Sequence, residues 1–263
     1  MTRQIVGVII MVVLLVVGCF AGTMFYKQYA DAKSSASTFE ELQEQIKNTE
    51  ELPSSETEQA TTEESENTPA ETESTAFDRY RPLQEQNSDM VGWIFIEGTE
   101  INYPVMHTPD NPDYYLKHSF EKTWSDYGVP YVEESCTVGS SNNLVIYGHN
   151  MKNGSMFSGL VQYKSKEFFE THPIICFDTV DEPGQYQVIA AFCYNTNNET
   201  FKYNEHSDMD EAEFAEYVAS CKSRSIYDAG VTAEYGDILI TLSTCEYTYT
   251  NGRFVVVAKK IVE

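Results

Sequence analysis

Residues 237–258, which read DILITLSTCEYTYTNGRFVVVA, decide the fold of this chain. The first apolar run ends in small hydroxyl residues before Cys245, and a second apolar run follows Arg253. The polar stretch between them closes on Asn251-Gly252, a dipeptide that favours tight hairpin turns. The pattern predicts two antiparallel strands that bring Cys245 and Arg253 close together at one rim of a sheet.

This predicted pair has a chemical meaning. A guanidinium beside a thiol favours the thiolate, which is the nucleophilic form of cysteine, and it also stabilises an oxyanion. On spacing alone, a packed thiol at the end of a strand is the alternative, and it stays open here.

A cysteine nucleophile needs a group that handles protons, and this group is usually a histidine. His149 follows the apolar run Leu144–Tyr147 and a glycine, which places it at a strand end where a side chain can face a cleft. His107 follows a strand in much the same way, so the pattern does not choose between them. The other histidines lie in polar loops: His118, His172 and His206.

Residues 77–263 show one residue pattern throughout, in which short runs rich in Val, Ile, Tyr and Phe alternate with turn-forming residues. Many short strands with turns between them predict one mostly-β domain, a closed barrel or a sandwich. The candidate strands are Val91–Ile96, Ile101–Met106, Val129–Val132, Leu144–Tyr147, Ile174–Phe177, Tyr186–Tyr194, Asp237–Leu242 and Phe254–Ile261.

Three helices are predicted to flank these strands, over Asp78–Asn87, Ser165–Glu170 and Met209–Lys222. The last has the clearest signal, because Asp208 with Glu211 three residues later resembles the box that starts a helix.

The N-terminus carries a candidate membrane span. Between Arg3 and Lys27 lie 23 uncharged residues, which reach ~34 Å as a helix against ~30 Å of hydrocarbon. The apolar stretch is too long for a secretory signal peptide, although Val16–Cys19 loosely resembles a lipoprotein cleavage box and leaves lipidation as the alternative. We therefore expect residues 1–4 in the cytoplasm and an uncleaved anchor over 5–26.

An acidic linker is predicted over 27–76. Between Glu50 and Glu73 there are nine Glu and two Pro and no basic residue, so this part lacks the apolar surface that offsets ordering. Residues 38–48 are a candidate short helix ahead of this disordered stalk. The stalk lifts the domain at 77–263 off the membrane surface.

Composition excludes other classes of protein. The chain has 41 acidic and 17 basic residues and a formal net charge of -24, which argues against nucleic acid as a partner. Cys19 lies in the anchor, which leaves an odd number of cysteines. Four of these are expected to be buried thiols, with a disulfide among them as the alternative: Cys136, Cys176, Cys193 and Cys221. No zinc-like spacing of Cys and His occurs, so we expect no structural metal.

Together these runs resemble the sortases, the cysteine transpeptidases of Gram-positive cell surfaces, and specifically class B. Residues 241–245 (TLSTC) are similar to the nucleophile motif of the family, and 147–149 (YGH) to its histidine motif. Arg253 with 255–258 (VVVA) is similar to its arginine strand. Further likeness lies in 91–94 (VGWI), 103–105 (YPV) and 113–116 (DYYL), so the resemblance covers 77–263 nearly end to end.

The resemblance implies an eight-stranded sortase barrel with flanking helices, held by a single span at the cell membrane with the catalytic domain outside. Cys245 would attack the Thr carbonyl in a C-terminal sorting motif of an exported protein, and an amine of peptidoglycan or its lipid-linked precursor would take the thioester. His149 would protonate the leaving amine and deprotonate the incoming one, while Arg253 would hold the substrate backbone or the oxyanion. Acyl transfer needs no cofactor, and none is expected.

Matching to class B also suggests residues that line the groove for the sorting motif: Leu116, Thr196, Phe201, Ser243 and Glu246. Each residue also has a structural role as the alternative to substrate binding. Leu116 and Phe201 are candidate core residues, Thr196 and Ser243 are candidate hydrogen bonders at strand ends, and Glu246 is a candidate solvated loop charge. The sequence of the sorting motif is left open.

Two other functions compete with this one. A papain-like peptidase would place its cysteine at the start of a helix and its histidine later in the chain, whereas here His149 precedes Cys245, which ends a strand. A non-catalytic adhesion barrel would leave Cys245 packed and unreactive.

Overall fold

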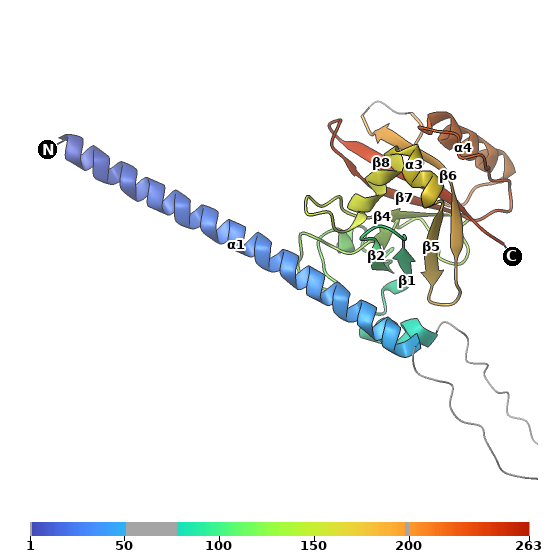
Figure 1. The fold of residues 1–263 in the computed structure, drawn as a ribbon, viewed down its shortest axis with the longest axis horizontal. Helices are drawn as coiled ribbons and strands as arrows, with labels where there is room; N and C mark the ends of the chain where they lie inside the picture. Colours follow the sequence, from blue (N-terminus) through green and yellow to red (C-terminus); the bar gives the residue numbers. More distant parts are fainter. Residues whose placement is uncertain (1, 51–77, 198–199, 263) are drawn as a thin grey trace, which may run out of the picture.

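The computed structural model describes residues 2–50, 78–197 and 200–262. In these residues eight strands close into a barrel in the order β1-β2-β3-β4-β7-β8-β6-β5 (Figure 1). This confirms the predicted barrel, and each predicted strand is present with its ends moved by a few residues. The strands are β1 (Met90–Phe95), β2 (Asn102–Met106), β3 (Tyr131–Val132), β4 (Asn143–Tyr147), β5 (Ile174–Thr179), β6 (Gln185–Asn195), β7 (Leu239–Glu246) and β8 (Gly252–Lys260).

Strands β4, β7 and β8 form the part of the barrel that positions the candidate site. β4 runs parallel to β7 with Tyr147 opposite Ser243, and β7 runs antiparallel to β8 with Cys245 opposite Arg253. Nearly all side chains of these strands are buried. The strands are covered on both faces, which explains why their sequences are nearly continuous apolar runs. The register therefore brings the end of β4, the end of β7 and the start of β8 to one rim.

The turn between β7 and β8 depends on its last two residues. Asn251 has φ 60°, in the left-handed region that Asn tolerates. At Gly252, an added Cβ would lie 2.5 Å from the carbonyl oxygen of Glu246, so only glycine allows this close approach of the backbone. The predicted hairpin is thus confirmed, with Asn251-Gly252 where the chain re-enters the sheet.

Short helices surround the barrel, and α4 lies along β6 (Figure 1). α4 begins two residues later than predicted, because its N-terminal box pairs Asp210 with Glu213 and not Asp208 with Glu211. The backbone of Asp210 explains the difference, since it is extended and its side chain accepts from the N–H groups of Ala212 and Glu213 as an N-cap, while the Met209 backbone before it is bonded to the Asn142 amide. The helices are η1 (Asp78–Tyr80), α2 (Arg81–Gln86), η2 (Tyr114–Leu116), η3 (Phe157–Lys164), α3 (Lys166–Thr171) and α4 (Glu211–Arg224).

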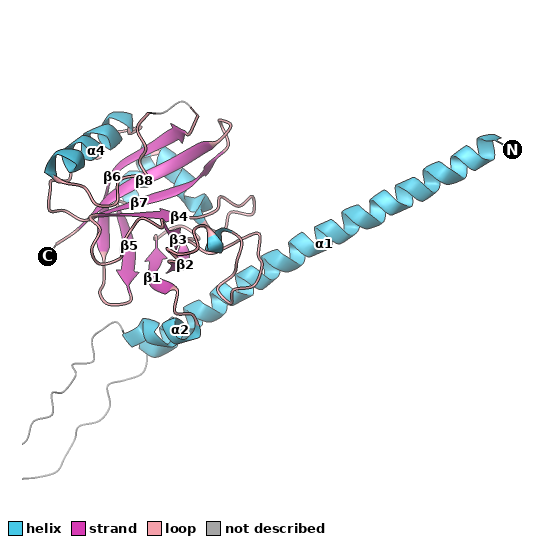
Figure 2. Cartoon of the chain, turned by 180° about the vertical axis from the view of Figure 1, so that it is seen from behind, coloured by secondary structure: helices cyan, strands magenta, loops and turns pink. Residues whose placement is uncertain are grey.

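The N-terminal helix α1 (Thr2–Glu50) is continuous and extends far beyond the barrel (Figure 2). Its apolar residues from Ile10 to Tyr29 are exposed, and the helix is long and apolar enough to cross a membrane. Residues 27–50, the first part of the predicted linker, continue the helix. The rest of the predicted linker, 51–76, lies outside the described residues.

The second half of α1 packs on the barrel through one face. Ser35, Phe39 and Leu42 are buried at helical spacing, and Ile46 packs beside them. The Phe39 ring lies edge-on to Tyr103, with 4.8 Å between the ring centroids. Since no Pro or Gly interrupts 27–50, this apolar face extends the helix well beyond the short segment predicted at 38–48.

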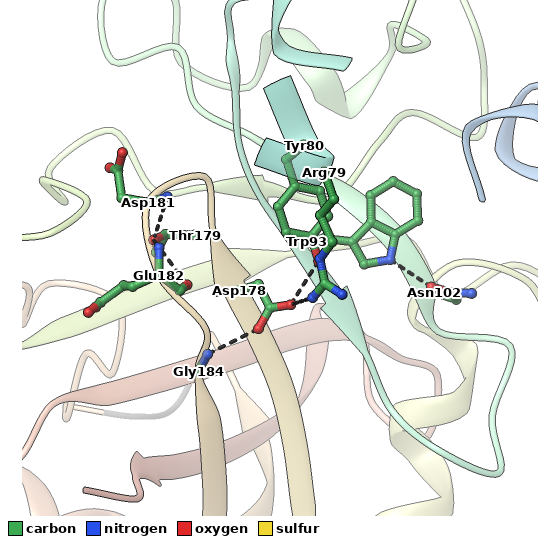
Figure 3. Close-up of polar contacts among 9 residues, drawn as sticks. All are labelled: Arg79, Tyr80, Trp93, Asn102, Asp178, Thr179, Asp181, Glu182 and Gly184. Atoms are coloured by element: carbon green, nitrogen blue, oxygen red, sulfur yellow. Dashed lines mark hydrogen bonds and ion pairs between the residues drawn. The ribbon is translucent and has the colours of Figure 1, made fainter. Parts of the chain in front are cut away.

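Polar contacts fasten the start of the domain to β5 and join β1 to β2 (Figure 3). Arg79 forms an ion pair with Asp178, and the Tyr80 hydroxyl donates to the same carboxylate at 2.8 Å. Trp93 donates from its indole nitrogen to the Asn102 side chain at 2.6 Å. The contacts of Arg79 and Tyr80 therefore hold the segment before β1 against β5.

Candidate active site

A cleft of about 520 Å³ opens at the rim where β4 and β7 end and β8 begins. His149, Cys245 and Arg253 all line it. The structure therefore brings the three predicted catalytic side chains to one cavity, as the proposed chemistry requires. His107, the alternative that the sequence left open, is not among the residues that line this cleft.

The hairpin places Cys245 beside Arg253. The two residues are direct cross-strand partners, so their side chains project from the same face of the sheet and are neighbours. Cys245 is half-buried, and Arg253 Nη1 donates to the carbonyl of Gly252 at 3.0 Å. The guanidinium is thus held at the cleft, on the same face of the sheet as the thiol.

Hydrogen bonds between strand ends place His149 near Cys245. The Gly148 N–H donates to the Ser243 carbonyl at 3.1 Å, and Thr244 Oγ1 donates to the Gly148 carbonyl at 2.7 Å. Asn150 Nδ2 donates to the Cys245 carbonyl at 2.8 Å. The residues on both sides of His149 are therefore tied to the last residues of β7.

Packing against Phe157 requires a glycine at position 148. An added Cβ at this position would lie 2.4 Å from the Phe157 ring, which is fully buried. Because the ring has no room to withdraw, a larger residue at 148 would displace the segment that carries His149.

The hydrogen bond of His149 assigns its tautomer. Nε2 lies 2.8 Å from the Leu116 carbonyl oxygen, which only accepts, so Nε2 carries the proton and Nδ1 is the basic nitrogen of the neutral ring. Burial lowers the pKa of His149, as does Lys117, whereas the Leu116 carbonyl and Asp126 raise it. The net pKa is below the ordinary value, so the neutral ring dominates near pH 7 in the free enzyme.

The other thiols of the domain are poor nucleophiles. Burial raises the pKa of Cys136 to about 11 and that of Cys221 to about 12, and it also raises the pKa values of Cys176 and Cys193. All the cysteines are free, in line with the prediction of unpaired thiols. Cys245 is the cysteine that lines the cleft.

Three of the residues suggested for substrate binding line the cleft, namely Leu116, Thr196 and Ser243. Leu116 is 36% exposed, Thr196 Oγ1 donates to the Asn251 carbonyl at 3.0 Å, and the Ser243 hydroxyl lies 2.7 Å from that of Tyr203. The hydroxyls of Thr196 and Ser243 therefore line the cleft and also form hydrogen bonds within its wall.

The other two suggested residues, Phe201 and Glu246, are not among the cleft-lining residues. The Phe201 ring packs against Tyr217 and lies beneath the Arg224 guanidinium at 4.8 Å. Glu246 follows Cys245 on the strand, so it projects to the opposite face, where its buried carboxylate accepts from Lys164 at 2.7 Å.

The structure also reveals a wall of tyrosines and carboxylates that sequence reasoning missed. Tyr131 donates to Asp113 at 2.6 Å, and Tyr147 donates to Glu133, all four residues lining the cleft. Burial and Glu134 raise the pKa of Glu133 to about 7, although the Tyr147 bond opposes the shift. The acids that directly follow Val132 at the end of a predicted strand were the available signal.

The chain resembles known proteins over the barrel and the cleft. A family model described as the sortase domain matches residues 94–261. Sortase B of Listeria monocytogenes is 35% identical over 189 residues, which cover 71% of this chain and 75% of that protein. The cleft-lining residues all fall inside the range of the family model.

Solved structures extend the likeness to the three-dimensional fold. A Staphylococcus aureus sortase B–substrate complex has a TM-score of 0.73 at 26% identity, and the match covers 88% of this chain and 98% of that one. A crystal structure of a sortase B complexed with triglycine has a TM-score of 0.71 at 27% identity, with the same coverage. The shared part includes the closed barrel that carries the cleft.

Proposed function

The chain belongs to class B of the sortase family and is a cysteine transpeptidase, and from this premise we propose how its cleft performs the reaction. The substrate is the C-terminal sorting motif of an exported protein, cleaved after a Thr. The acceptor is an amine of peptidoglycan or of its lipid-linked precursor. The convergence of a thiol, an imidazole and a guanidinium in one cleft is the observation that carries this proposal.

In the first half-reaction, Cys245 Sγ attacks the Thr carbonyl carbon. The C–S bond forms and the C–N bond to the next residue breaks. His149 takes the proton of the thiol and transfers it to the departing amine. Neutral His149 is the suitable partner because its unprotonated Nδ1 accepts this proton, while the Leu116 carbonyl holds Nε2–H.

Arg253 stabilises charge in this step. The carbonyl oxygen of the substrate becomes negative as sulfur adds, and the β7–β8 register places Arg253 directly opposite Cys245 on the cleft side of the sheet. A cation next to a developing oxyanion lowers the barrier, and the planar fork offers two parallel donors that a point charge lacks. The same fork can hold the substrate backbone before the attack.

In the second half-reaction, the acceptor amine attacks the thioester. His149 takes the amine proton and returns it to the sulfur, so the amide forms and the thiol is restored. The relatives support a bound substrate and an amine acceptor, since one sortase B structure holds a substrate and another holds triglycine. Leu116, Thr196 and Ser243 contact the sorting motif along the cleft wall.

We place residues 1–4 in the cytoplasm, a membrane anchor over 5–26 and the catalytic domain over 77–263 outside. The support is the exposed apolar half of α1, which is long enough to span a bilayer. Residues 27–50 then act as a helical support of the domain, and the remaining linker is 51–76.

A peptide assay tests the reaction. Full-length protein in detergent is incubated with peptides that carry Thr-containing sorting motifs, with and without a diamino acceptor, and products are identified by mass spectrometry. We expect cleavage at the Thr–x bond, a new amide with the acceptor, and an acyl adduct on Cys245.

Cys245→Ala is expected to abolish both products, and Cys193→Ala, which removes a half-buried thiol of β6, is its matched control. Hydrolysis that never yields the acceptor amide would indicate a peptidase in place of a transpeptidase. Normal turnover of Cys245→Ala would overturn the whole assignment.

A further inference from the structure

The loops at the cleft end of the barrel contact α1 just beyond its apolar half. The backbone N–H of Asp126 donates to the Asp31 side chain of α1 at 2.8 Å. Asp31 lies five residues after Tyr26, the end of the proposed anchor, which is a rise of about 7.5 Å along the helix. The end of the loop at Asp126 therefore sits close to the level at which α1 leaves the membrane, whereas Glu121 accepts from Thr38 farther along the helix.

This loop is part of the cleft rim. It follows Leu116, whose carbonyl accepts the hydrogen bond from His149. The segment after His149 lies against α1 as well, because Asn153 and Ser155 line a cavity with Ala36 of the helix. The 117–127 loop and the segment that follows His149 thus both lie on the side of the cleft that faces α1.

The ribbon shows the same orientation. β8 starts at the hairpin turn on the side of the barrel nearer the N-terminal half of α1, and it ends at the C-terminus on the far side (Figures 1 and 2). Since Cys245 and Arg253 lie next to this turn, the catalytic end of the barrel points toward the proposed membrane.

Exposed aromatic rings gather at this end. Trp124 is 62% exposed, and Tyr247 and Tyr249 in the β7–β8 turn are 71% and 52% exposed. The Tyr247 hydroxyl donates to the Asn150 carbonyl at 2.8 Å, which holds its ring beside the loop that follows His149. Trp and Tyr have an apolar body with a polar tip, and for this reason they favour the interface between lipid and water.

We propose that residues 124–126 at the end of the 117–127 loop and the 247–250 turn rest in the headgroup layer of the membrane, so that the cleft opens toward the lipid surface. The proposal rests on the anchor assigned to α1 above. The headgroup region adds about 5–8 Å on each side of the hydrocarbon, which matches the rise from Tyr26 to Asp31. A cleft in this position receives an acceptor whose lipid tail stays in the bilayer.

The contact is aromatic and not ionic. With a net charge of -24, the chain as a whole is repelled by anionic lipids. We therefore expect the contact to form on zwitterionic phosphatidylcholine and to be insensitive to salt.

Fluorescence of the two tryptophans tests the proposal on the full-length chain. Trp93 is buried in the barrel at 5% exposure, and Trp124 is the exposed one. The protein is reconstituted into phosphatidylcholine vesicles with or without bromine near the top of the acyl chains, because bromine quenches indoles within contact range. We expect wild type to lose a large part of its emission in brominated vesicles, and Trp124→Phe to lose several-fold less.

Equal losses in wild type and Trp124→Phe, or no loss in either, would overturn the proposal, provided that the protein floats with the vesicles after an alkaline wash. Absence from the vesicles would instead refute the anchor, and the membrane contact would fall with it. Peptide cleavage in detergent reports on the transpeptidase separately, and Trp124→Phe should leave it unchanged because Trp124 does not line the cleft.

Discussion

Cys245 and Arg253 face each other as direct partners across β7 and β8. Their separation in the chain is closed by a turn whose geometry depends on Asn251 and Gly252. The pair is therefore a property of one local hairpin, and its chemistry is sensitive to anything that moves that hairpin.

Replacing Arg253 by Lys tests the need for the planar fork. We expect Arg253→Lys to lower kcat for sorting-peptide cleavage by about 10²–10³-fold, since an ammonium cannot supply two parallel donors to the oxyanion. Steady-state kinetics with a fluorogenic peptide measures the effect. Arg81→Lys, at an exposed arginine away from the cleft, is the control and should keep wild-type kcat; equal rates for both variants would contradict the role of Arg253.

The pH dependence of kcat/KM reports on His149. Burial lowers the pKa of this ring, so the acid limb of the profile should lie below 6.5, with activity lost as the pH falls and the ring becomes protonated. Lys117 also lowers this pKa, so Lys117→Met should move the acid limb to higher pH. Lys122→Met, which instead removes an ion pair with Asp89, should leave the limb in place. A shift toward lower pH in Lys117→Met would refute this electrostatic account.

The ion pair between Lys164 and Glu246 supports the hairpin from beneath. The Glu246 carboxylate is 5% exposed, and Thr248 also donates to it from its backbone N–H at 2.9 Å. Lys164→Met leaves this charge buried without its cation, and we expect a loss of about 1–2 kcal/mol in the free energy of unfolding, because Lys164 itself is 39% exposed.

The loss should depend on pH. Although burial raises the pKa of Glu246, the bonds from Lys164 and Thr248 lower it on balance. The stabilisation is therefore present above the ordinary pKa of 4.5 and is lost as the pH falls through the lower folded value, so the difference between wild type and variant should be smaller at acid pH than at pH 7. Urea unfolding at pH 3 and pH 7 measures this. Lys166→Met, which breaks an exposed pair with Glu170, is the control, and an effect as large as that of Lys164→Met would contradict the role of burial.

The docking of α1 depends on Phe39. Its ring is 6% exposed against Tyr103, so Phe39→Ala should weaken the attachment of 35–46 by about 2–3 kcal/mol, at the low end for a buried aromatic because the site borders solvent. Hydrogen exchange of the α1 amides should accelerate by about 30- to 150-fold at that cost. Glu44→Ala on the exposed face of the helix is the control. Unchanged exchange in Phe39→Ala would show that α1 does not depend on this contact.

The sequence by itself determined the strands and the hairpin, because both depend on local signals. Alternating or continuous apolar runs mark the strands, and Asn251-Gly252 marks the turn. The turn fixes the strand register that places Cys245 opposite Arg253. The helical periodicity at 35–46 was also present in the sequence, but its apolar face becomes meaningful only against Tyr103.

The strand pattern left His149 and His107 open and the family resemblance favoured His149, but only the tertiary structure places His149, and not His107, in the cleft with Cys245. The choice depends on the parallel pairing of β4 with β7, whose residues lie almost a hundred positions apart, and no local pattern specifies such a partner. The same holds for Glu246, which pairs with Lys164 from a distant helix and not with the cleft. Local periodicity shows which side chains share a face, whereas the neighbours of that face are set by the closing of the barrel.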